Sequence, residues 1–151
     1  MRNREIEEER IRSLIHGMVA GYEEYRADAF ADLYAEDAEL TNVVGRTLSG
    51  RQAVLGHLRR LFAEPRFLAG RPVGETRSQL RWVTDDVVVV RTYQERAGQQ
   101  TTSGAVLPTR RTHSLKVLRR EDDAWRVVSD FYMDEREDSS LTYEDGSPGD
   151  G

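Results

Sequence analysis

The apolar residues of this chain change their spacing near residue 70. Before that point they recur three and four residues apart, as in amphipathic helices, and after it they alternate with polar residues, as in half-buried strands. Helices that precede strands, without alternating with them, favour an α+β fold over a doubly wound parallel sheet. We therefore expect helices packed on one face of a curved, mostly antiparallel sheet.

Three helices and a four-strand meander are expected. The helical stripes lie in residues 5–26, in the short stretch "RADAFADLYAED" (26–37) and in "SGRQAVLGHLRRLFAEP" (49–65). One strand is expected at "AELTNVV" (38–44), and "GRTLSG" (45–50) is a candidate for another. Two hairpins then turn at "TDD" and "EDD": "ETRSQLRWV" with "VVVVRTYQER", and "TRRTHSLKVLRR" with "AWRVVSDFYM".

The length of 151 residues fits one domain, which we place at residues 1–133. Residues 134–151 hold seven acids and one arginine, a net charge of −6, and few apolar side chains, so we expect a disordered tail. The body then carries a net charge of about +1, which gives no strong field for nucleic acid. No apolar run approaches the ~20 residues of a membrane span, cysteine is absent, and a cytoplasmic location is expected.

Common cofactor and hydrolase motifs are missing. Neither GxGxxG, GxxxxGK[ST], GxSxG nor HExxH occurs, and the three histidines lack metal-ligand spacing, so we expect no cofactor and no metal.

The candidate catalytic and substrate-binding residues are polar residues on strand faces that we predict to point toward the core. Asn42 shares a strand face with Leu40 and Val44, so its amide faces either a cavity ligand or a nearby backbone carbonyl. His113 shares a face with Leu115 and could exchange protons near neutral pH, although a structural core histidine fits equally. Asp130, beside Tyr132, is a general base if that face is apolar and a surface acid if it is solvated.

Further residues could line a ligand cavity. Aromatic residues are usually core, but they also form the walls of apolar pockets. The candidates for substrate binding, with Asn42, are Trp82, Tyr93, Tyr132, Arg111 and His57.

Four stretches, in this order, carry a family resemblance. They are "DAFADLYAEDAE", "TNVVG", "GRQAV" and "WRVV", spread over about residues 8–133. Their succession resembles the nuclear transport factor 2-like superfamily, and looks closest to its SgcJ/EcaC-type branch. The final strands of many relatives carry a histidine after the tryptophan motif, where this chain has Ser129, Asp130, Phe131 and Tyr132.

The resemblance implies a cone-shaped α+β fold similar to ketosteroid isomerase and scytalone dehydratase, with an apolar pocket and a homodimer formed through the outer sheet face. It also implies a role in bacterial enediyne biosynthesis beside a polyketide synthase. We expect cofactor-independent proton transfer, isomerisation or cyclisation of an apolar, polyene-like intermediate, with Asp130 or His113 as acid/base and Asn42 orienting the substrate. A non-catalytic carrier or synthase accessory, and a purely structural dimerisation domain, are the alternatives.

Overall fold

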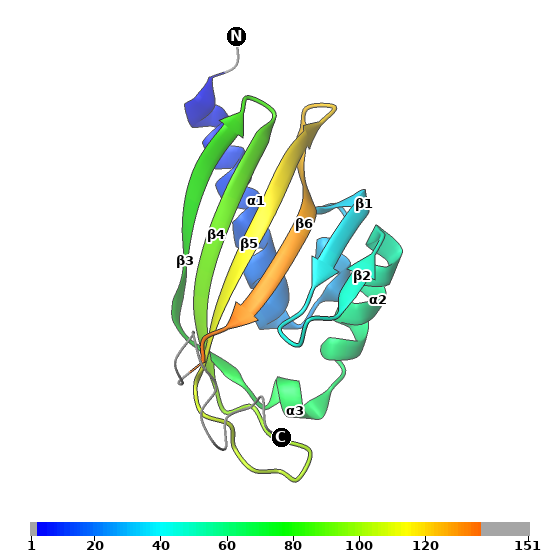
Figure 1. Cartoon of the computed structure of the whole chain (residues 1–151), viewed down its shortest axis with the longest axis vertical. Helices are drawn as coiled ribbons and strands as arrows, with labels where there is room; N and C mark the ends of the chain where they lie inside the picture. The colour runs from blue at the N-terminus through cyan, green and yellow to red at the C-terminus, as the bar shows by residue number, and fades with distance from the viewer. Residues whose placement is uncertain (1–2, 137–151) are drawn as a thin grey trace.

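The computed structural model describes residues 3–136 and has helices in the first half and a long meander in the second (Figure 1). This confirms the expected α+β class. The elements are α1 (Arg4–Glu24), η1 (Ala27–Phe30), β1 (Tyr34–Thr41), β2 (Thr47–Ser49), α2 (Arg51–Leu61), α3 (Pro65–Leu68), β3 (Arg71–Thr84), β4 (Val87–Ala97), β5 (Arg110–Glu121) and β6 (Ala124–Asp134).

One curved six-stranded sheet forms the body, in the order β2-β1-β6-β5-β4-β3. The β1 and β6 strands are parallel and every other pair is antiparallel, so the sheet is mixed. Both expected hairpins form, β3 with β4 and β5 with β6. The helix α1 lies across one face of the sheet, behind it in Figure 1. We call this covered face the inner face and the opposite face the outer face.

The core lies between α1 and the inner face. The apolar stripe of α1 supplies Ile11, Leu14, Ile15 and Met18, all at most 7% exposed. A buried glutamate, Glu7, ties this helix to the sheet, because its two carboxylate oxygens accept hydrogen bonds from Arg120 (2.9 Å) and Trp125 (2.6 Å). None of the helices within residues 3–136 has the length and apolar character needed to cross a lipid bilayer.

The helix expected over residues 26–37 is wrong. Only the single 3-10 turn η1 forms there, and the chain is a strand from Tyr34 onward. The reason is tertiary: β1 pairs with β6, and the amide of Val127 donates to the carbonyl of Leu33 at 2.8 Å. These inter-strand bonds outweigh a weak local preference for helix.

A β-bulge in β6 sets which of its side chains face α1. Val117 pairs with Ser129 but Leu118 pairs with Val127, so Val128 is the extra residue. Trp125 and Val127, which precede the bulge, and Asp130, which follows it, are therefore all buried on the inner face.

The end of the domain lies slightly beyond its expected position. Asp134, which the sequence placed in the tail, is the last residue of β6, and its carboxylate accepts hydrogen bonds from Arg110 (2.9 Å) and Thr112 (2.6 Å). Residues 137–151 of the tail that we expect to be disordered lie outside the described residues.

Candidate ligand pocket

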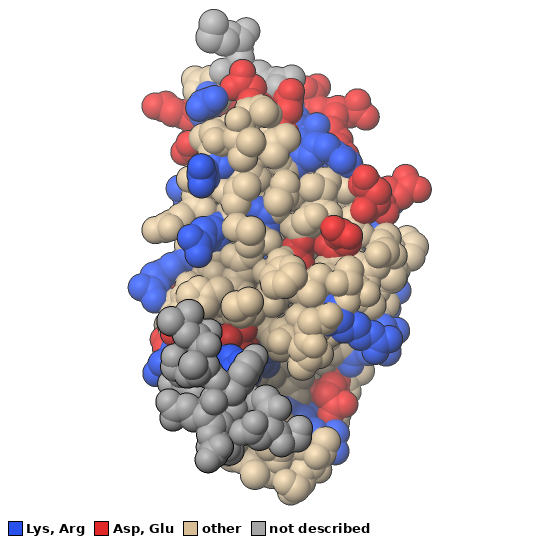
Figure 2. Space-filling view, in the orientation of Figure 1, with Lys and Arg blue, Asp and Glu red and all other residues tan. Residues whose placement is uncertain are grey.

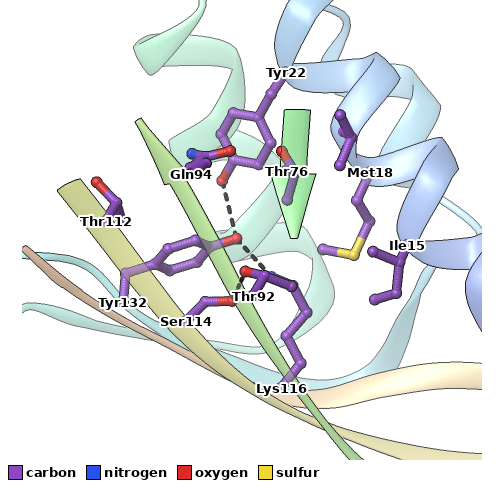
Figure 3. Close-up of a pocket in the computed structure, with 11 residues that line it drawn as sticks. Ile15, Met18, Tyr22, Thr76, Thr92, Gln94, Thr112, Ser114, Lys116 and Tyr132 are labelled. Carbon is purple, nitrogen blue, oxygen red and sulfur yellow. Dashed lines mark hydrogen bonds between the residues drawn. The ribbon is translucent and has the colours of Figure 1, made fainter. Parts of the chain in front are cut away.

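A small pocket lies between α1 and the inner face of the sheet (Figure 3). Its volume is about 20 Å³, enough for one water molecule, so a larger ligand must displace side chains such as the flexible Met18. The helix contributes apolar groups and the sheet contributes hydroxyl, amide and amine groups. The lining residues are Ile15, Met18, Val19, Tyr22, Thr76, Thr92, Gln94, Thr112, Ser114, Lys116 and Tyr132.

A buried ion pair stands in the wall of the pocket. Lys116 Nζ lies 2.8 Å from Asp130 Oδ1, and the two side chains are 4% and 0% exposed. Lys116 also donates to the hydroxyl of Tyr132 at 2.9 Å and lies over the ring of that tyrosine. Lys116 lines the pocket directly. Asp130 lies behind Lys116 and is linked to the pocket only through its hydrogen-bond partners.

Three tyrosines belong to this cluster, and two of them, Tyr22 and Tyr132, connect the carboxylate to the pocket. Tyr34 donates to Asp130 Oδ2 at 2.7 Å, and Tyr132 donates to the same oxygen at 3.0 Å. Tyr22, from α1, donates to the Tyr132 hydroxyl at 3.3 Å, the longest hydrogen bond of this cluster (Figure 3). The order Tyr22, Tyr132, Asp130 is thus a continuous path from the pocket to a buried carboxylate.

The phenols of this cluster stay protonated over the physiological range. Burial, and next the negative charge of Asp130, raise the pKa of Tyr22, Tyr34 and Tyr132 well above the ordinary value for tyrosine. All three are therefore neutral hydrogen-bond donors, and the negative charge of the cluster stays on the carboxylate.

Polar side chains continue along the inner face beside this cluster. Thr92 pairs in register with Ser114, and their hydroxyls are hydrogen-bonded to each other. Gln94 pairs in register with Thr112, one step further along the same two strands. The sheet side of the pocket is therefore a row of hydrogen-bonding groups, opposed by the apolar side of α1.

Two of the sequence-predicted site residues belong to this cluster. Tyr132 lines the pocket, and Asp130, 2% exposed, supports it from behind. Both face inward, as the alternation of the final strand allowed.

The inward assignment of the strand face that carries His113 and Leu115 is wrong. The even-numbered residues of β5 point inward, and Leu115 on the outer face is 45% exposed. His113 therefore lies on the outer face, where Nε2 is 3.1 Å from Glu135 Oε2 and the ring meets Tyr93 edge-on. Arg111 is also exposed there and lies 3.8 Å from Glu95. The face was misassigned because the pocket makes the inner face of β5 polar.

Tyr93 occupies the outer face beside His113 and is stacked under Arg77. Trp82 packs edge-on against Trp125, and its indole nitrogen donates to Glu8 at 2.9 Å. Neither residue lines the pocket.

Asn42 and His57 also lie away from the cluster. Asn42 follows β1, and its Oδ1 accepts from the backbone amides of Val44 (3.2 Å) and Arg46 (2.9 Å), so its partner is the protein's own turn. His57 lies half-buried on α2, where burial, and then Arg60 and Arg46, lower its pKa. Neither side chain reaches the pocket.

Sequence reasoning missed Lys116, Tyr22 and Tyr34. Tyr22 was assigned to the helical stripe and Tyr34 to a helix that does not form. One signal did point to Lys116: the chain has 22 basic residues, of which 21 are arginine and this one alone is lysine. Within residues 3–136 no three His, Cys, Asp or Glu side chains converge to hold a metal ion.

This chain is therefore an α+β protein in which a curved mixed sheet wraps over a long helix and a pocket lies between them. The SnoaL-like domain family matches residues 4–129, and this chain belongs to that family. No curated protein matches the chain.

Solved structures of several bacterial proteins share this fold. One is an uncharacterised protein with a cystatin-like fold from Caulobacter vibrioides, 15% identical, with a TM-score of 0.75 over 85% of this chain and 89% of that one. A second is a hexachlorocyclohexane dehydrochlorinase, LinA-type3, from Novosphingobium barchaimii, 18% identical, with a TM-score of 0.75 over 88% and 89% of the two chains. A third is a nuclear transport factor 2-like protein from Novosphingobium aromaticivorans, 21% identical, with a TM-score of 0.66 over 93% and 92%. These similarities establish the fold.

Proposed function

We propose that this chain is a small-molecule pocket protein of bacterial enediyne or related polyketide biosynthesis. It acts on an apolar, polyene-like intermediate that carries oxygen, by cofactor-independent proton transfer, isomerisation or cyclisation. The observation that carries the proposal is the path of phenols that joins the pocket to the buried Lys116–Asp130 pair.

The chemistry follows from the order of hydrogen bonds. A ligand group that replaces the long Tyr22–Tyr132 bond would hand a proton to Tyr132 while Tyr132 passes its own to Asp130. Lys116 would stabilise negative charge that develops on the ligand oxygen, as preorganised donors do in a dry site. Asp130 is thus the base that acts through Tyr132, and His113 on the outer face has no part in the step.

The wider biological assignment is supported by two similarities. The four sequence stretches resemble the SgcJ/EcaC-type proteins of enediyne pathways, and the chain belongs to the SnoaL-like domain family. The LinA-type3 neighbour, which is a dehydrochlorinase of hexachlorocyclohexane by name, is an example of this fold in an enzyme for a small apolar molecule.

A second candidate is a non-catalytic carrier or accessory of the polyketide synthase. The pairing of both Asp130 oxygens favours it. Oδ1 accepts from Lys116 and Oδ2 accepts from Tyr34 and Tyr132, and satisfied buried groups of this kind also serve to rigidify a core.

The deciding experiment uses substoichiometric protein with the polyene product of an enediyne polyketide synthase. A catalyst converts excess polyene, and Tyr132→Phe or Asp130→Asn abolishes conversion, while the outer-face variant His113→Gln retains it. Saturation at one polyene per protein identifies the carrier instead. Conversion unaffected by Tyr132→Phe and Asp130→Asn together would refute the catalytic assignment.

A further inference from the structure

The only lysine of the chain lies in the wall of the pocket. Of the 22 basic residues, 21 are arginines, and Lys116 is the exception. An arginine would serve a buried ion pair with a carboxylate at least as well, because its planar guanidinium can bond both oxygens. An amine differs from a guanidinium in one chemical respect: once it gives up a proton it is a nucleophile.

The surroundings of Lys116 Nζ suit that role. The ammonium has three N–H donors, of which one bonds to Asp130 (2.8 Å) and one to Tyr132 (2.9 Å). Within residues 3–136 the third has no protein partner, and the side chain borders the cavity. A carboxylate at hydrogen-bond distance can receive the proton that the amine must lose before it attacks carbon.

We propose that Lys116 captures an aldehyde or ketone group of the ligand as an imine. This deepens the proposed function and rests on it, because it assigns the ligand of that same pocket a carbonyl group. Lys116 passes one ammonium proton to Asp130, and the free amine forms a C–N bond to the carbonyl carbon as the C=O π bond breaks. A second nitrogen proton moves to the carbonyl oxygen, which gives a neutral carbinolamine. Asp130 then returns its proton to that hydroxyl, the C–O bond breaks and water leaves, and the third proton stays on the nitrogen of the resulting iminium.

The charge of the site is conserved in this reaction. One ammonium and one carbonyl become one iminium and one water, so Asp130 again faces a single positive charge at the same nitrogen. The ion pair that stabilises the empty site therefore also stabilises the product. A protonated imine also acidifies the carbon next to it, which is where proton transfer or isomerisation of a polyene ligand would begin.

The walls define the rest of the ligand. Opposite the row of hydroxyl and amide groups lie Ile15, Met18 and Val19 of α1. A carbonyl compound with an unbranched apolar chain would place the chain against the helix and the carbonyl at Lys116 (Figure 3).

Reductive trapping with hexanal tests the proposal. The folded full-length chain is incubated with hexanal and cyanoborohydride, and the adduct is located by peptide mass mapping. We expect one adduct on Lys116, formed at least about tenfold faster in the folded protein than in the urea-unfolded chain, since the pocket orients the carbonyl beside the amine. The α-amine of the N-terminus serves as an internal reference. Lys116→Arg, which keeps the positive charge, should lose the adduct, and Asp130→Asn should slow it.

Slower labelling of Lys116 in the folded protein than in the unfolded chain would overturn the proposal and make the pair purely structural. Hexanol has the same chain but cannot form an imine, so it tests the pocket function separately from the imine proposal. Thermal stabilisation by hexanol without trapping of hexanal refutes the imine and leaves the pocket function standing. If hexanal gives no adduct and hexanol gives no thermal stabilisation, both the imine and the pocket function are refuted.

Discussion

Lys116 Nζ lies 2.8 Å from Asp130 Oδ1, and both side chains are almost completely removed from water. Such a pair is tolerated only when the charges also have good hydrogen bonds. Tyr132 bonds to both partners, and Tyr34 adds a second bond to the carboxylate. The stability of the fold and the proposed chemistry of the pocket therefore depend on the same two charges.

Lys116→Met should destabilise the protein by about 3 to 5 kcal/mol, because it leaves the Asp130 carboxylate buried without a cation. The double variant Lys116→Met/Asp130→Asn should recover much of this loss, since the neutral amide still accepts from Tyr34. Urea denaturation of the wild type and both variants, with Asp130→Asn alone, completes the cycle. If the double variant is as unstable as Lys116→Met, the uncompensated charge is not the cause.

Tyr34→Phe should cost about 1 to 3 kcal/mol, because it removes the shortest hydrogen bond to Asp130 and leaves that oxygen with Tyr132 alone. Tyr93→Phe is the matched control on the outer face and should change stability little. Thermal unfolding of the two variants under one condition gives the comparison. Equal effects would mean that the Tyr34 bond contributes nothing specific.

Alkaline pH should unfold the protein through its inward phenols. The unfolded chain releases tyrosine protons near pH ~10, whereas the raised pKa of Tyr22, Tyr34 and Tyr132 keeps them protonated in the fold. The folded state then holds more protons, so the free energy of unfolding is unaffected well below pH ~10 and falls as pH rises beyond it.

Tyrosinate absorbance and near-ultraviolet circular dichroism, recorded together against pH, check this. The inward phenols should titrate only as the fold is lost, and Tyr34→Phe should make stability fall less steeply with pH. Complete titration of all tyrosines with the fold intact would show that these phenols are not protected.

The spacing of apolar residues along the sequence was sufficient to predict the fold class but not where the first strand, β1, begins. Both hairpins were predicted because their alternation and their turns are local. The strand β1 was missed at its beginning because it is defined by parallel pairing to β6, almost a hundred residues away in the sequence, and "AFADLY" alone carries a helical spacing.

The site was harder to predict than the fold because its faces break the usual rule. On β5 the inward residues include Thr112, Ser114 and Lys116, while the outward Leu115 is apolar. The bulge at Val128 is equally invisible in the alternation of β6, although Asp130 and Tyr132 were placed correctly relative to each other. The clearest signal was compositional, the single lysine, and it required no geometry.

Asn42 should affect the turn between β1 and β2 without affecting the pocket. Asn42→Ala removes the acceptor for two backbone amides and should cost about 1 to 2 kcal/mol. Asn42→Asp keeps the acceptor and should cost less. Hexanol should raise the melting temperature of wild type and Asn42→Ala by the same amount. If Asn42→Ala abolished the rise in melting temperature caused by hexanol, Asn42 would belong to the ligand site.

The outer face carries exposed apolar side chains on two neighbouring strands. Leu115, Phe131 and Met133 are 45%, 48% and 60% exposed and lie on the neighbouring strands β5 and β6, and Figure 2 shows mostly uncharged surface over the middle of the sheet. We propose that two chains associate here, because apolar groups gathered on one face are typical of interfaces.

Leu115→Glu combined with Met133→Glu should convert the homodimer to a monomer in sedimentation experiments, since burying two carboxylates against their own copies costs more than the contact returns. Ile6→Glu is the matched control, because Ile6 is 50% exposed on α1, the helix that covers the opposite, inner face of the sheet. It should leave the dimer intact. A wild-type chain that sediments as a monomer at every concentration would contradict the proposal, and so would a double variant that remains dimeric, because the interface would then lie elsewhere.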